Sequence, residues 1–300
     1  MFSVKIFVTI SILSLNFVIA QSSREIKLNC EIDKDQRDTE EFFTYVTCNF
    51  PDDVKPEETL SITSNNLDMA TLRHQNKSVK VKFETTQNYP AQLPTHLATH
   101  LYGTTNFYYQ NSPLEKIHRC DFRDFGHRIT LIDLAHNQIK EIPHDTFHDL
   151  HSLSYLSIEH NHVKKLEADT FKHAPQLTTL IIRNNQINEL HPELFKHSTQ
   201  FYVLYGEHNH ITELCGDLFE KNSQMEIISL KQNRISKVDV DFREFKNLSL
   251  VDLTGNADGC DFMYFNNHPY EAKGYSEMEL KKWEKDLDIF QKNVEENCQA

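Results

Sequence analysis

The chain has 300 residues, a formal net charge of −13 and only seven glycines. Its acidic balance argues against nucleic acid or an anionic membrane surface as a partner. The sequence contains no H-E-x-x-H motif, no G-x-S-x-G motif and no glycine-rich phosphate loop. These motifs carry metal, nucleophile and phosphate chemistry, so we expect a protein that is not an enzyme and predict no cofactor.

The N-terminal segment 1–20 has the pattern of a secretory signal peptide. Lys5 precedes an apolar run, and Val18 and Ala20 occupy the positions typical of a cleavage site, which would start the mature chain at Gln21. No later segment offers the roughly 18 consecutive apolar residues that a membrane span needs. The sequence therefore predicts a secreted, extracellular protein without a membrane span.

Secretion would place the six cysteines in an oxidising compartment, where pairs form disulfides. Cys30 and Cys48 lie just before the first repeat described below, and Cys260 and Cys298 lie after the last one. Each pair is predicted to staple one end cap, with a stabilisation of roughly 3 to 4 kcal/mol per disulfide.

A motif recurs every 24 residues in the middle of the chain, and asparagine is its most regular member. The ladder asparagines are Asn137, Asn161, Asn185, Asn209 and Asn233. Around each of them the sequence follows the frame L-x-x-L-x-L-x-x-N-x-L-x-x-L, which is the signature of the leucine-rich repeat. Weaker turns are expected between the N-terminal cap and these repeats, at 58–67, 80–94 and 107–122 with Ser112 in the asparagine place, giving about nine repeats. The predicted domains are a signal peptide (1–20), an N-terminal cysteine cap (21–54), the repeats (55–257) and a C-terminal cap (258–300).

The repeat frame predicts short parallel strands whose leucine-type residues point inward and whose x residues point outward. The rest of each repeat, with a recurring phenylalanine, then returns along the convex side with little regular structure. No single repeat buries its own apolar face, so the repeats must stack. The predicted fold class is an α/β repeat fold, a curved leucine-rich repeat solenoid with parallel strands on its concave face and disulfide caps at both ends.

The ladder asparagines are predicted to have a structural role. Their side-chain amides can bond backbone groups of neighbouring turns that would otherwise lack a partner inside the coil. Gly206 stands at an inward position and leaves a deficit there, which neighbours such as Tyr205 either fill or leave open.

The outward positions of successive strands form three predicted columns across the concave face. The first, unusually apolar column contains Asn106, Leu131, Tyr155, Thr179, Val203, Ile227 and Leu250. The second contains Tyr108, Asp133, Ser157, Ile181, Tyr205, Ser229 and Asp252, and the third contains Gln110, Ala135, Glu159, Arg183, Glu207, Lys231 and Thr254. An apolar stripe beside tyrosine and arginine is typical of a protein-binding surface, but β-branched and aromatic residues also suit strands whatever they face. The candidate partner-binding residues are Leu131, Tyr155, Ile181, Arg183, Val203, Tyr205 and Ile227.

Seventeen histidines raise the question of a metal site. His136, His160 and His208 directly precede ladder asparagines, and His162 and His210 directly follow them. No repeat supplies a third convergent ligand, and the intervening repeat has Asn184 and Gln186 at these positions. We therefore interpret these histidines as a solvated turn edge and predict no metal site.

Modification and pairing of single residues can also be read from the sequence. Asn76 and Asn247 stand in glycosylation sequons, which are accessible to the enzyme in a secreted chain. Cys120 and Cys215 lie four repeats apart, about 20 Å at strand spacing, whereas a disulfide needs less than roughly 7 Å. Cys120, two residues before Phe122, is expected to be buried, and Cys215 is expected to be accessible for an intermolecular link.

The C-terminal segment 278–294 has an apolar helical face formed by Leu280, Trp283, Leu287, Phe290 and Val294. Charged residues occupy the opposite face. The pattern spans barely two heptads, so we favour a capping helix held by Cys298 over a coiled coil.

Several of these features occur together in one known group of proteins. The N-terminal C-x17-C segment ending in YVTCNF, the 24-residue repeats and the cysteine directly after them resemble secreted leucine-rich repeat proteins of dipteran insects. Among these, the chain is most similar to a short member of the leucine-rich immune proteins of mosquitoes. The resemblance covers nearly the whole mature chain. In that family the longer members form disulfide-linked dimers and bind complement-like thioester proteins, but this chain lacks their long coiled coil.

The leading hypothesis is a secreted, non-enzymatic binding protein that recognises an extracellular protein in innate immunity through its concave face. The resemblance implies a complement-like thioester protein or another leucine-rich repeat chain as partner, and a monomer or disulfide-linked dimer. A cell-adhesion or extracellular-matrix protein, or a secreted salivary or regulatory ligand-binding factor, is the alternative. Outward residues vary freely on a fixed repeat frame, so the sequence does not name the partner.

Overall fold

The computed structural model describes residues 24–32, 43–51, 54, 60–65, 78–83, 90–101, 103–257, 259–265 and 277–298. The predicted signal peptide 1–20 and the sequon at Asn76 lie outside the described residues.

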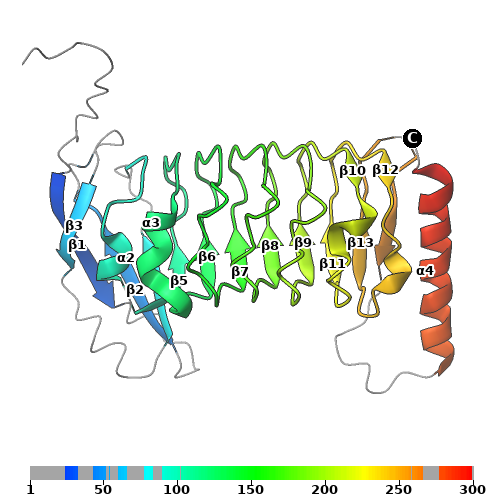
Figure 1. Ribbon diagram of the computed structural model, residues 1–300, viewed down its shortest axis with the longest axis horizontal. Coiled ribbons are helices and arrows are strands. Elements are labelled where there is room, and N and C mark those ends of the chain that lie inside the picture. Colours follow the sequence, from blue (N-terminus) through cyan, green and yellow to red (C-terminus); the bar gives the residue numbers. More distant parts are fainter. Residues whose placement is uncertain are drawn as a thin grey trace, which may run out of the picture.

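Twelve of the described strands form one long sheet with the order β14-β13-β11-β9-β8-β7-β6-β5-β4-β2-β1-β3. The strands lie side by side along the long axis of the molecule (Figure 1). Its repeat strands are β4 (Ser78–Phe83), β5 (Thr104–Tyr108), β6 (Leu131–Asp133), β7 (Tyr155–Ser157), β8 (Thr179–Ile181), β9 (Val203–Tyr205), β11 (Ile227–Ser229) and β13 (Leu250–Asp252). All are parallel, so this part of the sheet is the predicted leucine-rich repeat stack.

The return segments contain little regular structure, as expected. A second sheet pairs β10 (Glu213–Leu214) with β12 (Lys237–Val238). Short helical turns are α2 (Leu97–His100), α3 (Arg119–Phe122), η1 (Arg123–Arg128), η2 (Gly216–Phe219) and η3 (Phe242–Glu244). No helix of the described segments combines the length and the apolar character that crossing a membrane requires.

The core lies inside the coil, where the repeat phenylalanines form a continuous stack. The ring centroids of Phe147 and Phe171 are 6.0 Å apart, and those of Phe171 and Phe195 are 6.3 Å apart. The stack continues to Phe219 at 5.9 Å. The 24-residue period places one ring against the next in each turn. Aromatic pairs at these distances stabilise the core beyond their burial alone.

The ladder asparagines form the predicted buried column. The amide nitrogen of Asn185 donates to the carbonyls of Ile158 (2.9 Å) and Ile182 (3.1 Å), and its amide oxygen accepts from the Val163 N–H (3.0 Å). The other ladder asparagines repeat this pattern. Ser112 takes the asparagine place one turn earlier and contacts Asn137 through its backbone N–H at 3.1 Å. The structural role assigned to these residues is therefore confirmed.

A second ladder, made of hydroxyl groups, precedes the strands and was not foreseen from the sequence. The hydroxyls of Thr130, Ser154 and Thr178 each donate to the carbonyl of the corresponding residue one repeat earlier, at 3.2, 3.1 and 2.9 Å. Its 24-residue spacing was available as a signal in the sequence. The next two repeats carry Tyr202 and Glu226 at this position instead, which interrupts what we call the hydroxyl ladder.

The space above Gly206 is filled by neighbouring repeats. A Cβ atom there would lie 2.8 Å from Cδ2 of Leu230 and 3.5 Å from Cδ1 of Ile182. These two core side chains, and not Tyr205, therefore occupy the deficit that the glycine leaves.

The N-terminal cap is a disulfide-linked hairpin. β1 (Arg24–Ile32) and β2 (Phe43–Asn49) are antiparallel, with Cys30 opposite Cys48 and a disulfide between them at a Cα–Cα distance of 4.0 Å. β2 pairs in parallel with β4, so the hairpin joins the stack directly.

The prediction that 58–67 forms a repeat between this cap and the stack is wrong. β3 (Leu60–Asn65) pairs in parallel with β1 and lies at the outer edge of the sheet (Figure 1). Because β1 runs antiparallel to β2, β3 runs opposite to the repeat strands and cannot be one of them. The hairpin takes the place beside β4 that a repeat would have taken.

The C-terminal end is covered by a strand and a long helix. β14 (Met263–Phe265) runs antiparallel to β13, and α4 (Glu277–Asn297) stands across the end of the solenoid (Figure 1). Phe290 and Val294 are buried, Leu287 packs against the core, and Cys260 is bonded to Cys298 at a Cα–Cα distance of 4.9 Å. These contacts confirm the capping helix, whereas the side chains of Leu280 and Trp283 lie outside the described residues.

The prediction for Cys120 is wrong. Both Cys120 and Cys215 are unpaired, but Cys120 is exposed and Cys215 is only partly exposed. Cys120 lies in the short helix α3, where Phe122 turns into the core and the cysteine faces away from it. Proximity in sequence to a core phenylalanine therefore did not imply burial.

Candidate functional site

The candidate site is the strand face, which we define as the outward side chains of β5, β6, β7, β8, β9, β11, β13 and β14, together with the residue two positions after each repeat strand, such as Arg183. The strand register matches the first two predicted columns. Leu131 lies opposite Tyr155, which lies opposite Thr179, and the line continues through Val203 and Ile227. Most of these side chains are partly exposed, whereas the inward residue between them on each strand is fully buried. Val203, at 8% exposed, is buried, as are Ser157 and Ser229, so the face is accessible at most of its positions and not at all of them.

An arginine at the centre of the strand face is held in place by two neighbours. Nε of Arg183 lies 2.7 Å from Oε2 of Glu207, and its guanidinium carbon lies 4.1 Å from the centroid of the Tyr205 ring. The ion pair and the cation–π contact both favour this position of the side chain. Three of the predicted site residues, Arg183, Tyr205 and Ile181, are therefore brought together here, since Ile181 pairs with Tyr205 across the strands.

Tyr155 lies beside two carboxylates on the strand face. Burial raises the pKa of Tyr155 to about 12, with further contributions from the charges of Asp133 and Glu159. Burial also raises the pKa of Asp133, although this carboxylate accepts hydrogen bonds from the Gln110 amide and the Ala135 N–H. The Tyr155 hydroxyl therefore stays protonated at physiological pH and can donate a hydrogen bond to a partner.

The apolar column extends beyond the last repeat, onto a strand that the repeat pattern did not include. Phe265 on β14 lies opposite Leu250, and Met263 lies opposite Asp252. Met263 is 59% exposed and Phe265 61% exposed, which makes them the most exposed large hydrophobic side chains on the strand face. Their alternation around buried Tyr264 was the available sequence signal, but β14 follows Cys260 and lies outside the 24-residue period.

Glu226 is the second feature that sequence reasoning missed. It occupies a position of the hydroxyl ladder and is only 6% exposed, and none of the described residues forms a hydrogen bond with its Oε1 atom. Burial raises the pKa of this carboxyl to about 7. A carboxyl group that is removed from water without a partner favours its protonated form. Glu226 directly precedes the outward-facing Ile227, so this group lies at the border of the strand face.

The histidines beside the asparagine ladder have a conformational explanation. His136, His160 and His208 adopt left-handed backbone conformations, with φ between 52° and 57°. Histidine and asparagine are enriched in this conformation. The rings of His136 and His160 stack with centroids 4.1 Å apart. Among the described residues, no group of three or more potential ligands is placed to hold a metal ion.

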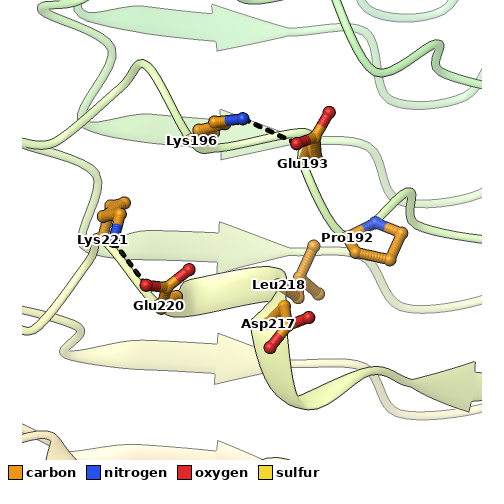
Figure 2. Close-up of a pocket in the computed structure, with 7 residues that line it drawn as sticks. All are labelled: Pro192, Glu193, Lys196, Asp217, Leu218, Glu220 and Lys221. Carbon is orange, nitrogen blue, oxygen red and sulfur yellow. Dashed lines mark hydrogen bonds and ion pairs between the residues drawn. The ribbon is translucent and has the colours of Figure 1, made fainter.

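A small pocket of about 120 Å³ lies between two return segments (Figure 2). Lys196 pairs with Glu193 at 2.6 Å, and Lys221 pairs with Glu220, so the charged side chains around it largely satisfy one another. The pocket offers an alternative surface to the strand face, but it is small, and Pro192 and Leu218 are the two apolar residues among the seven that line it.

Comparison with known proteins identifies the repeats. Residues 110–163, 155–211 and 200–257 match the family model described as leucine rich repeat. No curated protein matches the chain. The match covers the middle of the molecule, where the asparagine ladder and the parallel strands lie.

Solved structures share the fold. The crystal structure of the TLR13–ssRNA13 complex matches with a TM-score of 0.51 and 20% identity, over 63% of this chain and 27% of that one. The crystal structure of the complex of the mosquito proteins LRIM1 and APL1C matches with a TM-score of 0.51 and 18% identity, over 76% of this chain and 46% of that one. This chain therefore spans less than half the length of either. The strand register, the asparagine ladder and these matches together show that the chain has the leucine-rich repeat fold.

Proposed function

We propose that the chain is a secreted, non-enzymatic protein that binds an extracellular protein partner in innate immunity through its strand face. The observation that carries the proposal is the strand register, which aligns partly exposed apolar and aromatic side chains with a fixed arginine on adjacent strands. Aromatic and arginine side chains are the usual anchors of protein interfaces.

Further support comes from the fold and its relatives. Leucine-rich repeat folds are typically interaction scaffolds, and one of the similar structures is a complex between two leucine-rich repeat proteins. A complement-like thioester protein or another leucine-rich repeat chain is therefore the partner that we propose to test first. Secretion is consistent with the two disulfides that close the ends of the solenoid.

The test is a pull-down from extracellular fluid of the source organism with the chain from Gln21 onward. Replacement of both Tyr155 and Tyr205 by alanine removes two aromatic anchors from the strand face. We expect a loss of partner retention of at least about tenfold, since such anchors contribute on the order of 2 kcal/mol each. The thermal melt should change little because both side chains are partly exposed.

The matched control is Lys172→Glu on a return segment, where Lys172 is exposed. It should leave both retention and melting unchanged. Retention that survives the double tyrosine substitution but is abolished by Lys172→Glu would place the binding surface on the convex side and overturn the proposal.

A further inference from the structure

The C-terminal end of the strand face combines an apolar surface with a buried acid. Ile227, Leu250 and Phe265 lie opposite one another on three adjacent strands, and Met263 adds a second exposed apolar side chain on the last of them. We call these four side chains the C-terminal apolar patch. A contiguous exposed apolar surface often marks an interaction site, whereas apolar residues scattered singly on a surface do not.

The backbone of Glu226 lies at the edge of this patch. It precedes Ile227 in the chain, and its carbonyl accepts the backbone N–H groups of Ser249 (2.8 Å) and Leu250 (3.0 Å), which fixes the residue beside β13. The Ser249 hydroxyl donates to the same carbonyl at 3.0 Å and not to the carboxyl group. The backbone of Glu226 is therefore satisfied on the repeat frame, whereas its Oε1 atom has no partner in the part of the chain that the structure describes.

A buried polar group without a partner is unusual in folded proteins and calls for an explanation. The equivalent positions in three earlier repeats carry serine or threonine, and their hydroxyls satisfy a carbonyl of the preceding turn. Glu226 does not make this bond, and among the described residues its Oε1 atom is left without a partner. A hydrogen-bond donor on a molecule outside the chain would give this carboxyl oxygen a partner.

The surrounding charges favour a cationic group. Among the described residues of the strand face from β9 onward, Glu207 is paired with Arg183, which leaves Asp252 and Glu226 against the one cation Lys231. The whole chain carries a formal net charge of −13. Electrostatic complementarity therefore selects a positive partner segment and disfavours a second copy of this acidic chain.

We propose that the C-terminal apolar patch and Glu226 together bind a protein segment that carries a lysine or arginine next to an aromatic or long aliphatic side chain. The apolar side chain packs on Phe265 and Leu250, and the ammonium or guanidinium group donates to the Glu226 carboxylate. This inference rests on the proposed function, since it specifies the chemistry of the partner.

The test uses a displayed library of random linear peptides, selected on the folded chain from Gln21 onward. Four proteins are compared: wild type, Glu226→Gln, Phe265→Ser and the control Glu244→Gln, whose side chain is exposed in η3. Circular dichroism confirms that each variant is folded. Glu226→Gln keeps the shape of the side chain and removes only its negative charge.

We expect wild type and Glu244→Gln to retain peptides in which a basic residue adjoins an aromatic or aliphatic one. Glu226→Gln should weaken binding of these peptides by about tenfold, which corresponds to one charge-assisted hydrogen bond. Phe265→Ser should abolish their retention. Binding of the same peptides should be unchanged in Glu244→Gln, because Glu244 is exposed and lies away from the patch in η3.

Several results would overturn the inference. They are retention of acidic or purely apolar peptides, unchanged affinity in Glu226→Gln, or no retention at all. Self-association of the wild-type chain that Phe265→Ser abolishes would instead make a second copy the occupant. If the natural partner is lost with the tyrosine substitutions but retained by Glu226→Gln, the proposed function stands and this inference alone fails.

Discussion

At the scale of single residues, the asparagine ladder separates structural from functional positions. Asn185 satisfies backbone groups on two neighbouring turns and is only 6% exposed. Its replacement by leucine keeps the strand pattern, leaves the buried Val163 N–H without its acceptor, and removes one of two side-chain donors from each of the Ile158 and Ile182 carbonyls. We expect a loss of about 2 kcal/mol or more in the free energy of unfolding.

Urea denaturation measures this loss, with Asn188→Leu as the control because Asn188 is exposed in the same repeat. If both variants unfold at the same denaturant concentration, the ladder does not stabilise the solenoid. Partner binding should persist in Asn185→Leu at temperatures where the variant is folded, because its side chain points away from the strand face.

Glu226 gives the unfolding free energy a specific pH dependence. Its folded pKa of about 7 lies above the ordinary glutamate value, so the native state holds the proton more tightly than the unfolded state. The protonated Glu226 carboxyl therefore contributes to the free energy of unfolding. This contribution is fully present below the pKa that the group has in the unfolded state, and it is lost as pH rises through about 7. Its size is on the order of 3 kcal/mol at most, since one pKa unit corresponds to about 1.4 kcal/mol.

We therefore expect Glu226→Gln to be more stable than wild type at pH 8, and the difference to shrink towards pH 5. Thermal melts of the two proteins across this range measure it, with Glu244→Gln as the control for a glutamate at the surface. A difference that stays constant with pH would mean that Glu226 is hydrated in the native state.

Which residues the sequence could identify depended on the repeat period. The three columns were predictable because equal spacing puts equivalent residues opposite one another, as the register of Tyr155 with Thr179 shows. Phe265 was missed because β14 follows the last repeat and runs antiparallel to it. The sequence could not show that the Glu226 carboxyl lacks a hydrogen bond. That depends on the direction of the Ser249 hydroxyl, which donates to the Glu226 carbonyl instead.

At the scale of elements, the C-terminal helix depends on one polar contact as well as on its apolar face. Oε1 of Gln291 accepts the Phe242 N–H at 2.9 Å, and its Nε2 donates to the Val240 carbonyl at 3.3 Å. Gln291 is 3% exposed. It thereby satisfies backbone groups of the last return segment that the end of the solenoid would otherwise leave without a partner.

Replacement of Gln291 by leucine should destabilise the chain by about 1 to 3 kcal/mol, since two buried backbone groups lose their partner. Guanidinium denaturation gives the value, and Lys292→Leu is the control because Lys292 is exposed on the next position of α4. Equal midpoints for the two variants would show that the disulfide Cys260–Cys298 and the apolar face alone hold the helix.

Element order was the part of the fold that the sequence did not reveal. Local patterns correctly indicated a strand near residue 60, but not that β3 would pair with β1 beyond the cap. Pairing between strands depends on contacts distant in sequence, and β1 and β2 form a disulfide-linked hairpin that joins β4 first. The C-terminal cap was easier to predict because its helical face is encoded within one segment.

At the scale of the whole molecule, the covered ends of the repeat stack limit how two copies of the chain can associate. Both ends of the repeat stack are covered, by the hairpin and β3 at one end and by β14 and α4 at the other (Figure 1). An open end would expose core side chains and favour end-to-end stacking. Association of two chains would therefore have to occur through a side surface or through an unpaired thiol.

The two unpaired cysteines make that second route testable. A dimer linked through Cys215 remains a prediction, and the structure adds Cys120 as the more exposed thiol. Burial raises the pKa of both thiols, as do the charges of Asp121 beside Cys120 and of Glu213 beside Cys215. Both should therefore react slowly, since the thiolate is the reactive form.

We expect iodoacetamide to modify Cys120 several-fold faster than Cys215 in the native protein, because of its greater exposure. A fraction of the wild-type protein should run as a dimer on non-reducing gels, and Cys215→Ser should remove that band while Cys120→Ser retains it. A dimer lost only in Cys120→Ser would transfer the link to the exposed thiol. If wild type and both variants give the monomer band alone, the two thiols serve no intermolecular link, and contacts between copies must be non-covalent.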